Sequence, residues 1–162
     1  MAASEQYTLL TEKIIGAAMR VHTQLGPGLL ESAYEACLAF ELTSSGLVVE
    51  RQKPLPVIYR DVQLDCGYRL DLVVQGAGVV EIKSVDALIP IHTAQILSYL
   101  KLSGHHVGLL INFNVQHLRS VIRRLLHDIS LSASPYLSIS LSSSVSLCVL
   151  CGSSRPLEVM PV

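Results

Sequence analysis

Between residues 69 and 83 the sequence reads Arg69-Leu70-Asp71-Leu72-Val73-Val74, a short turn signal, and Val79-Val80-Glu81-Ile82-Lys83. Both apolar runs have the composition of core strands, and the intervening Gln75-Gly76-Ala77-Gly78 is typical of a turn. Residues two apart in a strand point to the same face, so Glu81 and Lys83 are predicted to project together while Ile82 packs behind them. The turn then brings Asp71 beside Glu81.

Two carboxylates in apolar strands need a stabilising partner, because like charges repel and a desolvated charge is costly. A divalent cation is the simplest such partner, and Mg²⁺ or Mn²⁺ prefers carboxylates, a backbone carbonyl and waters. The D…ExK spacing is short, however, and common by chance. Taken alone, it favours an exposed pair of Glu81 and Lys83 with Asp71 at a strand edge.

The segments on either side predict an alternation of helices and strands. Apolar residues recur at three- and four-residue spacing over residues 4–25 and 30–44, which predicts two amphipathic helices separated by Gly26-Pro27-Gly28. Extended runs follow at residues 47–52, 55–59, 68–74 and 79–83. They are followed by a helix over 91–103, a buried strand over 107–112 and a last helix over 115–127. This order predicts the α/β class, with a mixed β-sheet flanked by helices.

The composition is that of one folded domain, or of one domain and a tail. The chain has 162 residues, of which 50% are hydrophobic and 15% charged, which excludes a wholly disordered or fibrous protein. The formal net charge is −1, so a nucleic-acid partner would be held by a local patch and a metal rather than by bulk charge. The first residues lack the pattern of a secretory signal. Of four cysteines, Cys148 and Cys151 form a lone CxxC, for which reduced thiols in a cytoplasmic protein are the plainer interpretation.

The amino-acid composition of the chain changes near residue 129. Residues 130–162 contain eleven serines, and residues 137–142 alternate apolar and hydroxyl side chains. Three interpretations stay open: a Ser-rich low-complexity tail, a strand or helix packed on the domain, and a membrane anchor. The first is favoured, because serines interrupt every apolar run well short of the ~18 residues that a membrane helix needs. We therefore expect one domain over residues 1–129 and a poorly ordered tail over 130–162.

Several stretches together resemble a known family, the GxxExxY branch of the PD-(D/E)XK nuclease superfamily. The naming motif corresponds to Gly28-Leu29-Leu30-Glu31-Ser32-Ala33-Tyr34, and the superfamily signature to Asp71 with Glu81-Ile82-Lys83. Further similar stretches are Val21-His22, Leu25-Gly26-Pro27-Gly28, Gln52-Lys53-Pro54-Leu55-Pro56-Val57, Gln95-Ile96-Leu97-Ser98-Tyr99-Leu100 and Gly108-Leu109-Leu110-Ile111-Asn112-Phe113. The resemblance runs in order from about Ile14 to Leu126, and the tail shares nothing with it.

The resemblance implies a restriction-endonuclease-like core and a set of site residues. The residues that it implies for the metal are Asp71, Glu81, Ile82 through its backbone carbonyl, and Glu31 directly or through water. Those that it implies for catalysis are Lys83, Glu81, Asp71, Gln95 and Tyr99. By the same resemblance, Lys83 would be the catalytic lysine, which orients or activates the attacking water, and Gln95 and Tyr99 would form the QxxxY pair near the site.

The function that this resemblance to a bacterial branch implies is a Mg²⁺- or Mn²⁺-dependent nuclease that hydrolyses phosphodiester bonds in DNA or RNA, and the reduced thiols and lack of a signal pattern predict a cytoplasmic location. It implies nucleic acid as partner and no membrane, and it allows a homodimer. Two alternatives stay open: a catalytically silent nuclease-fold module that binds nucleic acid or a protein, and a metal-dependent hydrolase of a small phosphorylated substrate. The presence of Asp71, Glu81 and Lys83 favours an active site over a silent one.

Other residues have plainer interpretations. Arg119, Arg123 and Arg124 fall on the predicted last helix, where a solvated helix face explains them better than contacts with a phosphate backbone. His22 is expected to be structural or to support the site rather than to act in catalysis. Tyr34 has the helical spacing of a core residue and belongs to the naming motif, so both roles stay open.

Overall fold

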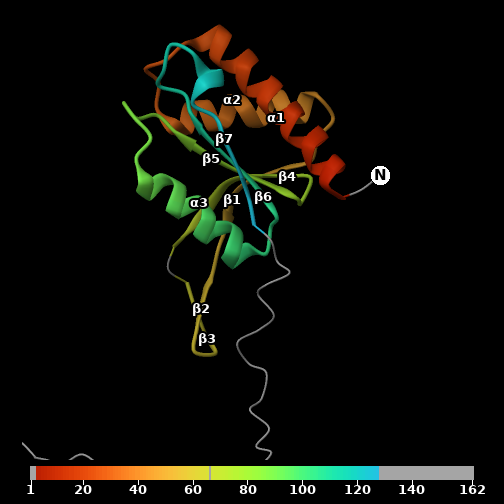
Figure 1. Ribbon diagram of the computed structural model, residues 1–162, viewed down its shortest axis with the longest axis vertical. Helices are drawn as coiled ribbons and strands as arrows, with labels where there is room; N and C mark the ends of the chain where they lie inside the picture. The colour runs from red at the N-terminus through yellow and green to blue at the C-terminus, as the bar shows by residue number, and fades with distance from the viewer. Residues whose placement is uncertain (1–2, 66, 128–162) are drawn as a thin grey trace, which may run out of the picture.

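The structure, a computed structural model, describes residues 3–65 and 67–127 of the chain. Its elements, in chain order, are α1 (Ala3–Leu25), α2 (Glu31–Ser44), β1 (Val49–Pro54), β2 (Val57–Tyr59), β3 (Val62–Leu64), β4 (Arg69–Val74), β5 (Gly78–Lys83), α3 (Pro90–Ser103), β6 (Val107–Asn112), a 3₁₀ helix (Leu118–Ser120) and β7 (Arg123–Leu126). Figure 1 shows α1 and α2 on one side of the strands and α3 on the other.

Five strands form a mixed sheet in the order β1-β4-β5-β6-β7. The pairs β1–β4 and β4–β5 are antiparallel, and β5 pairs with β6 in parallel. The last strand, β7, is antiparallel to β6. Parallel neighbours need a crossover, and α3 supplies it between β5 and β6. The predicted mixed sheet flanked by helices is therefore confirmed.

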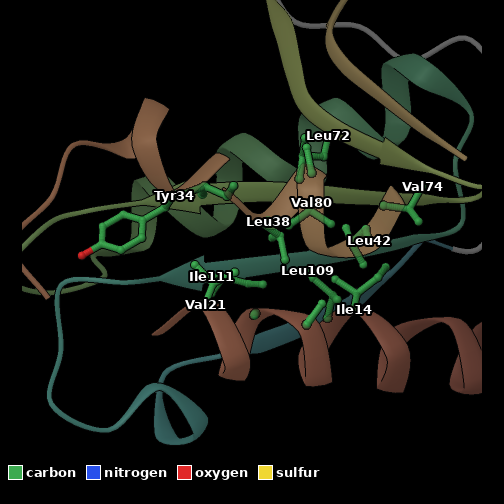
Figure 2. Packing of buried hydrophobic residues seen from close by; sticks show 14 of the residues in the cluster. Ile14, Val21, Tyr34, Leu38, Leu42, Leu72, Val74, Val80, Leu109 and Ile111 are labelled. Atoms are coloured by element: carbon green, nitrogen blue, oxygen red, sulfur yellow. The ribbon is translucent and has the colours of Figure 1, made fainter. Parts of the chain in front are cut away.

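The larger core lies between the sheet and the pair α1 and α2. Their apolar stripes face the alternate strand residues that point to this side. Figure 2 shows the side chains that meet there: Ile14 and Val21 from α1, Tyr34, Leu38 and Leu42 from α2, and Leu72, Val74, Val80, Leu109 and Ile111 from the strands. This core fixes the orientation of β4 and β5 and hence of the polar residues on their other positions.

The opposite face of the sheet is covered by α3. Ile96, Tyr99 and Leu100 pack on Val79 of β5 and Leu110 of β6. The approach is close, because a Cβ added at Gly108 would lie 2.9 Å from Ile96 Cδ1 and 3.1 Å from Leu100 Cδ1. The sheet is thus enclosed on both faces, and its ends are left for polar residues.

The predicted last helix over residues 115–127 is wrong. The segment instead forms the 3₁₀ helix Leu118–Ser120 and the strand β7, in which Leu126 pairs with Val107 of β6. Apolar residues spaced three and four apart suggested a helix, but pairing with β6 satisfies the backbone groups of an otherwise open strand edge. Arg123 and Arg124 therefore alternate across a strand: Arg123 donates to Thr93 Oγ1 of α3 at 3.0 Å and Arg124 to Thr8 Oγ1 of α1 at 3.3 Å.

A small hairpin projects from the sheet between β1 and β4 (Figure 1). The turn predicted at Arg60-Asp61 is present, and both residues have positive φ angles, 48° and 64°. Two such residues in a two-residue loop are the conformation that suits the twist of a hairpin. The sequence pattern predicted extended structure at 55–59 but missed β3.

Two further expectations concern the membrane and the tail. Across residues 3–65 and 67–127, no helix combines the length and apolar character needed to span a membrane. The tail predicted over residues 130–162, with its alternating segment and its CxxC, lies outside the described residues.

Candidate active site

The site begins where β4 and β5 separate. Their pairing ends at Leu72 and Val80, so Asp71 and Glu81, the next residues along, are not joined through their backbones. Instead, the backbone N–H of Ile82 donates to Asp71 Oδ2 at 2.9 Å. The N–H and C=O of a strand residue point to the same edge, so the Ile82 carbonyl is directed to the same gap.

Glu81 and Lys83 project together, as the strand period predicted. Lys83 Nζ lies 2.6 Å from Glu81 Oε1, and the two side chains are only 13% and 3% exposed. Ile82, between them, packs in the core on the opposite face. The second oxygen of Glu81, Oε2, is buried and has no hydrogen-bond partner within the described part of the chain. A buried carboxylate oxygen without a donor is costly, and it marks a position where a ligand can bind.

Glu31 reaches the site from the start of α2. Its Oε1 accepts a hydrogen bond from the backbone N–H of Ser84 at 2.9 Å, directly after Lys83. The Ser84 hydroxyl in turn donates to the carbonyl of Leu29 at 2.6 Å. These contacts bind the end of β5 to the start of α2, beside an open cavity of about 400 Å³ lined by Leu29, Leu30, Glu31, Ser32 and Ser84.

Gly28 and Tyr34, the two ends of the motif that contains Glu31, both have structural roles. Gly28 has a φ of 101°, a conformation that favours glycine. The Tyr34 hydroxyl donates to the carbonyl of Gly26 at 2.6 Å and accepts from the N–H of Leu29 at 3.1 Å. Tyr34 is fully buried, so it supports the loop that leads to Glu31 from within the core.

Phe113 packs against Tyr34, and His22 contacts the segment that follows β6. The Tyr34 ring stacks on Phe113 with ring centroids 4.5 Å apart. His22 Nε2 lies 2.7 Å from the carbonyl of Val115, in the segment that follows β6. His22 therefore joins α1 to that segment, which agrees with the structural role expected for it.

Three residues beside the site were not among the predicted site residues: Glu35, Arg51 and Gln52. Glu35 is only 5% exposed although it is an acid. Arg51 Nε donates to its Oε1 at 2.9 Å and Gln52 Nε2 to its Oε2 at 2.6 Å. The one sequence signal was that Glu35 follows Glu31 by four residues on a helix and so shares its face.

Burial and mutual repulsion shift the protonation of the acids. Burial raises the pKa of Asp71, against the hydrogen bond from Ile82 and the charge of Lys83, which lower it. Burial, together with the charge of Asp71, raises the pKa of Glu81 to about 7. Burial lowers the pKa of Lys83, but its hydrogen bond to Glu81 and the charges of the surrounding acids outweigh that effect, so its pKa is raised. Lys83 is thus a cation and Glu81 a group that a proton or another cation stabilises.

Gln95 and Tyr99 contact each other but do not join the cluster of Asp71, Glu81 and Lys83. Gln95 Nε2 donates to Tyr99 Oη at 2.8 Å along α3. Neither side chain hydrogen-bonds to Asp71, Glu81 or Lys83 within the described residues. They lie on the helix that covers Val79, whose side chain points to the same face of β5 as that of Glu81.

The oxygen atoms at the site are of the chemical type that binds a divalent cation. Asp71 Oδ1 has only a long contact, 3.4 Å from Gln52 Nε2, and Glu81 Oε2 has no donor. Two carboxylate oxygens and the Ile82 carbonyl are the hard ligands that Mg²⁺ and Mn²⁺ bind. In residues 3–65 and 67–127, however, no group of three or more His, Cys, Asp or Glu residues is arranged to hold a metal by itself. Solvent ligands would have to complete the coordination.

Comparison with known proteins gave one family. A family model described as the PD-(D/E)XK nuclease superfamily matches residues 8–125. No curated protein and no solved structure matched the chain. The matched range contains α2, β1, β4, β5 and α3, which carry the residues of the candidate site.

Proposed function

The chain belongs to the PD-(D/E)XK nuclease superfamily, and on that premise we propose that it is a divalent-metal-dependent nuclease that hydrolyses phosphodiester bonds in DNA or RNA. The observation that carries the proposal is the convergence of Asp71, Glu81 and Lys83 where β4 leaves β5. The ion pair with Lys83 does not account for Glu81 Oε2, which is buried without a donor in the described part of the chain and which a bound cation would satisfy.

We propose that Asp71, Glu81 and the Ile82 carbonyl hold the cation, with Glu31 supporting it from α2. When bound, Mg²⁺ or Mn²⁺ neutralises charge on the phosphate and lowers the pKa of a coordinated water. Asp71 is pre-oriented by the Ile82 N–H, and Glu81 by Lys83. Glu31 is bound to the Ser84 N–H and so sits beside the same strand end.

Lys83 is proposed as the catalytic lysine. Its ammonium lies against Glu81 and is 13% exposed, so it is held in place yet reachable from solvent. An ammonium at this point orients a water by hydrogen bonding and stabilises negative charge that develops on the phosphate. Without a metal, its hydrogen bond to Glu81 and the charges of the surrounding acids raise the pKa of Lys83.

We also propose that the chain belongs to the GxxExxY branch and that Gln95 and Tyr99 border the path of the substrate. Support for the branch comes from the loop that Gly28 and Tyr34 hold in place before Glu31. Support for the pair comes from its location on the helix that covers the face of β5 from which Glu81 projects.

The test is a cleavage assay on plasmid, single-stranded DNA and RNA with Mn²⁺. The wild type, Lys83→Ala and Glu81→Ala are compared with Lys53→Ala, which removes an exposed lysine paired with Glu50. We expect cleavage by the wild type and by Lys53→Ala, loss in the two site variants, and loss with a chelator. Equal degradation by all four proteins would indicate contamination. No cleavage by any of them would overturn the proposal in favour of a silent module or a small-substrate hydrolase.

A further inference from the structure

The strand β1 is irregular at one residue. Gln52 has a φ of 49°, the left-handed conformation that residues other than glycine adopt only occasionally. Its neighbours Arg51 and Lys53 pair with β4, but Gln52 does not, and the residue opposite it in this register is Asp71. The pairing of β1 with β4 is therefore interrupted at the position of the site aspartate.

This irregularity places the Gln52 amide between two carboxylates. Its Nε2 donates to Glu35 Oε2 at 2.6 Å and lies 3.4 Å from Asp71 Oδ1. An amide nitrogen carries two hydrogens, so one group can donate to both acids. With the Ile82 N–H on Oδ2, both oxygens of Asp71 then face a fixed donor.

Glu35 is the anchored end of this arrangement. It is buried on α2, and Arg51 holds its other oxygen at 2.9 Å. Both oxygens of Glu35 are therefore occupied by protein donors, whereas Asp71 Oδ1 has only the long contact. The Gln52 amide is thus bound firmly to Glu35 and directed at Asp71.

We propose that Gln52 is a positioning residue, which uses Glu35 as an anchor to hold the Asp71 carboxylate in the orientation that binds the catalytic cation. The inference rests on the proposed function. A neutral amide suits the role, since a third carboxylate would repel the other two and an ammonium would neutralise them. Partners of this kind around metal ligands affect metal affinity without touching the metal.

The first test is Gln52→Asn, followed by titration of the full chain with Mn²⁺ in a calorimeter. Asparagine tolerates the left-handed backbone but is one methylene shorter, so its amide cannot reach both acids. We expect Mn²⁺ to bind about tenfold more weakly, with an unchanged unfolding midpoint. The matched control is Gln75→Asn, because Gln75 has a similar φ of 55° in the exposed turn between β4 and β5. This control should bind Mn²⁺ as the wild type does.

A second pair of variants separates positioning from simple neutralisation of Glu35. Gln52→Leu leaves Glu35 Oε2 without its donor while Arg51 still holds Oε1, and Gln52→Leu with Glu35→Gln removes the charge of Glu35 as well. If Gln52 positions Asp71, the double variant regains thermal stability while its Mn²⁺ affinity stays low. If the double variant regained wild-type affinity, Gln52 would only compensate Glu35, and the inference would be overturned.

The same titrations distinguish this inference from the proposed function. Wild-type binding that Glu81→Ala abolishes but Gln52→Asn leaves unchanged would overturn the role of Gln52 and leave the metal site standing. Absence of Mn²⁺ binding to the wild type would overturn the proposed function, and the inference with it.

Discussion

At the scale of single residues, Glu81 determines how the site responds to pH. Its pKa is raised from 4.5 to about 7 by burial and by Asp71, so the folded protein holds this proton more tightly than the unfolded chain does. Between these two values the folded state binds more protons, and its stability without metal therefore falls as the pH rises. Above about pH 7 the loss is complete.

We predict that Glu81→Gln stabilises the metal-free protein at pH 8 on the order of 1–3 kcal/mol, because glutamine, like the protonated acid, carries no charge where burial and Asp71 disfavour one. The difference in free energy of unfolding between Glu81→Gln and the wild type should shrink as the pH falls from 7 towards 4.5. Urea unfolding across this pH range measures the difference. Glu50→Gln is the control, because Glu50 is exposed and paired with Lys53. Equal pH dependence of Glu81→Gln and the wild type would contradict the raised pKa.

Tyr34 permits a second prediction at this scale. Tyr34→Phe removes one hydroxyl that joins the Gly26 carbonyl to the Leu29 N–H and keeps the ring stacked on Phe113. We expect a loss of about 1–2 kcal/mol in the free energy of unfolding, with Mn²⁺ affinity unchanged. A normal stability with lost metal binding would instead make Tyr34 part of the site.

The sequence indicated some of these residues and not others, for a physical reason. Asp71, Glu81 and Lys83 lie on two strands joined by a short turn, and the strand period alone brings them together. Gln52 and Glu35 meet them only through the alignment of β1 with β4 and through one left-handed residue. Neither feature leaves a mark in the local pattern of apolar and polar residues.

At the scale of elements, the packing of α3 on β6 allows a direct test. A Cβ at Gly108 would meet Ile96 and Leu100 at distances that force these side chains to shift. We predict that Gly108→Ala lowers the free energy of unfolding by about 1–3 kcal/mol.

The comparison for this variant is Gly16→Ala in the middle of α1, where the added Cβ has only the end of Arg20 within 4 Å, at 3.8 Å. There the same change should stabilise the protein by up to about 1 kcal/mol through helix propensity. Urea unfolding gives both values. A neutral or stabilising Gly108→Ala would show that α3 packs less closely than described.

In the segment after β6, the sequence pattern predicted the wrong type of element. Its apolar spacing was compatible with a helix, and only the open edge of β6 makes the strand preferable. Helices α1, α2 and α3 were predicted closely, because each has its own apolar stripe and turn residues at its end. The strand β7, which pairs with β6, was therefore missed, and so was β3, a three-residue strand of the hairpin.

At the scale of the whole molecule, the described residues form a core of sheet and helices from which the hairpin β2–β3 projects (Figure 1). Val57, Tyr59, Val62 and Leu64 share one face of that hairpin, and the last three are exposed. The residues that build the site lie outside it. We infer that the hairpin contributes little to folding of the core.

We therefore predict that residues 57–66 can be replaced by Asn-Gly, a two-residue turn that continues the β1–β4 register from Pro56 to Gly67. The free energy of unfolding should change by less than about 1 kcal/mol, and Mn²⁺ affinity should be retained. Differential scanning calorimetry and Mn²⁺ titration test this. Loss of the cooperative transition would show that the hairpin is part of the core.

The central claim is that Asp71 and Glu81 hold a divalent cation beside Lys83. Anomalous X-ray scattering from crystals grown with Mn²⁺ locates such an ion directly. We predict one strong peak in contact with Asp71 and Glu81, which is absent from crystals of Glu81→Ala grown in the same way. A fully folded crystal with no peak there, or with Mn²⁺ bound only elsewhere, would contradict the account.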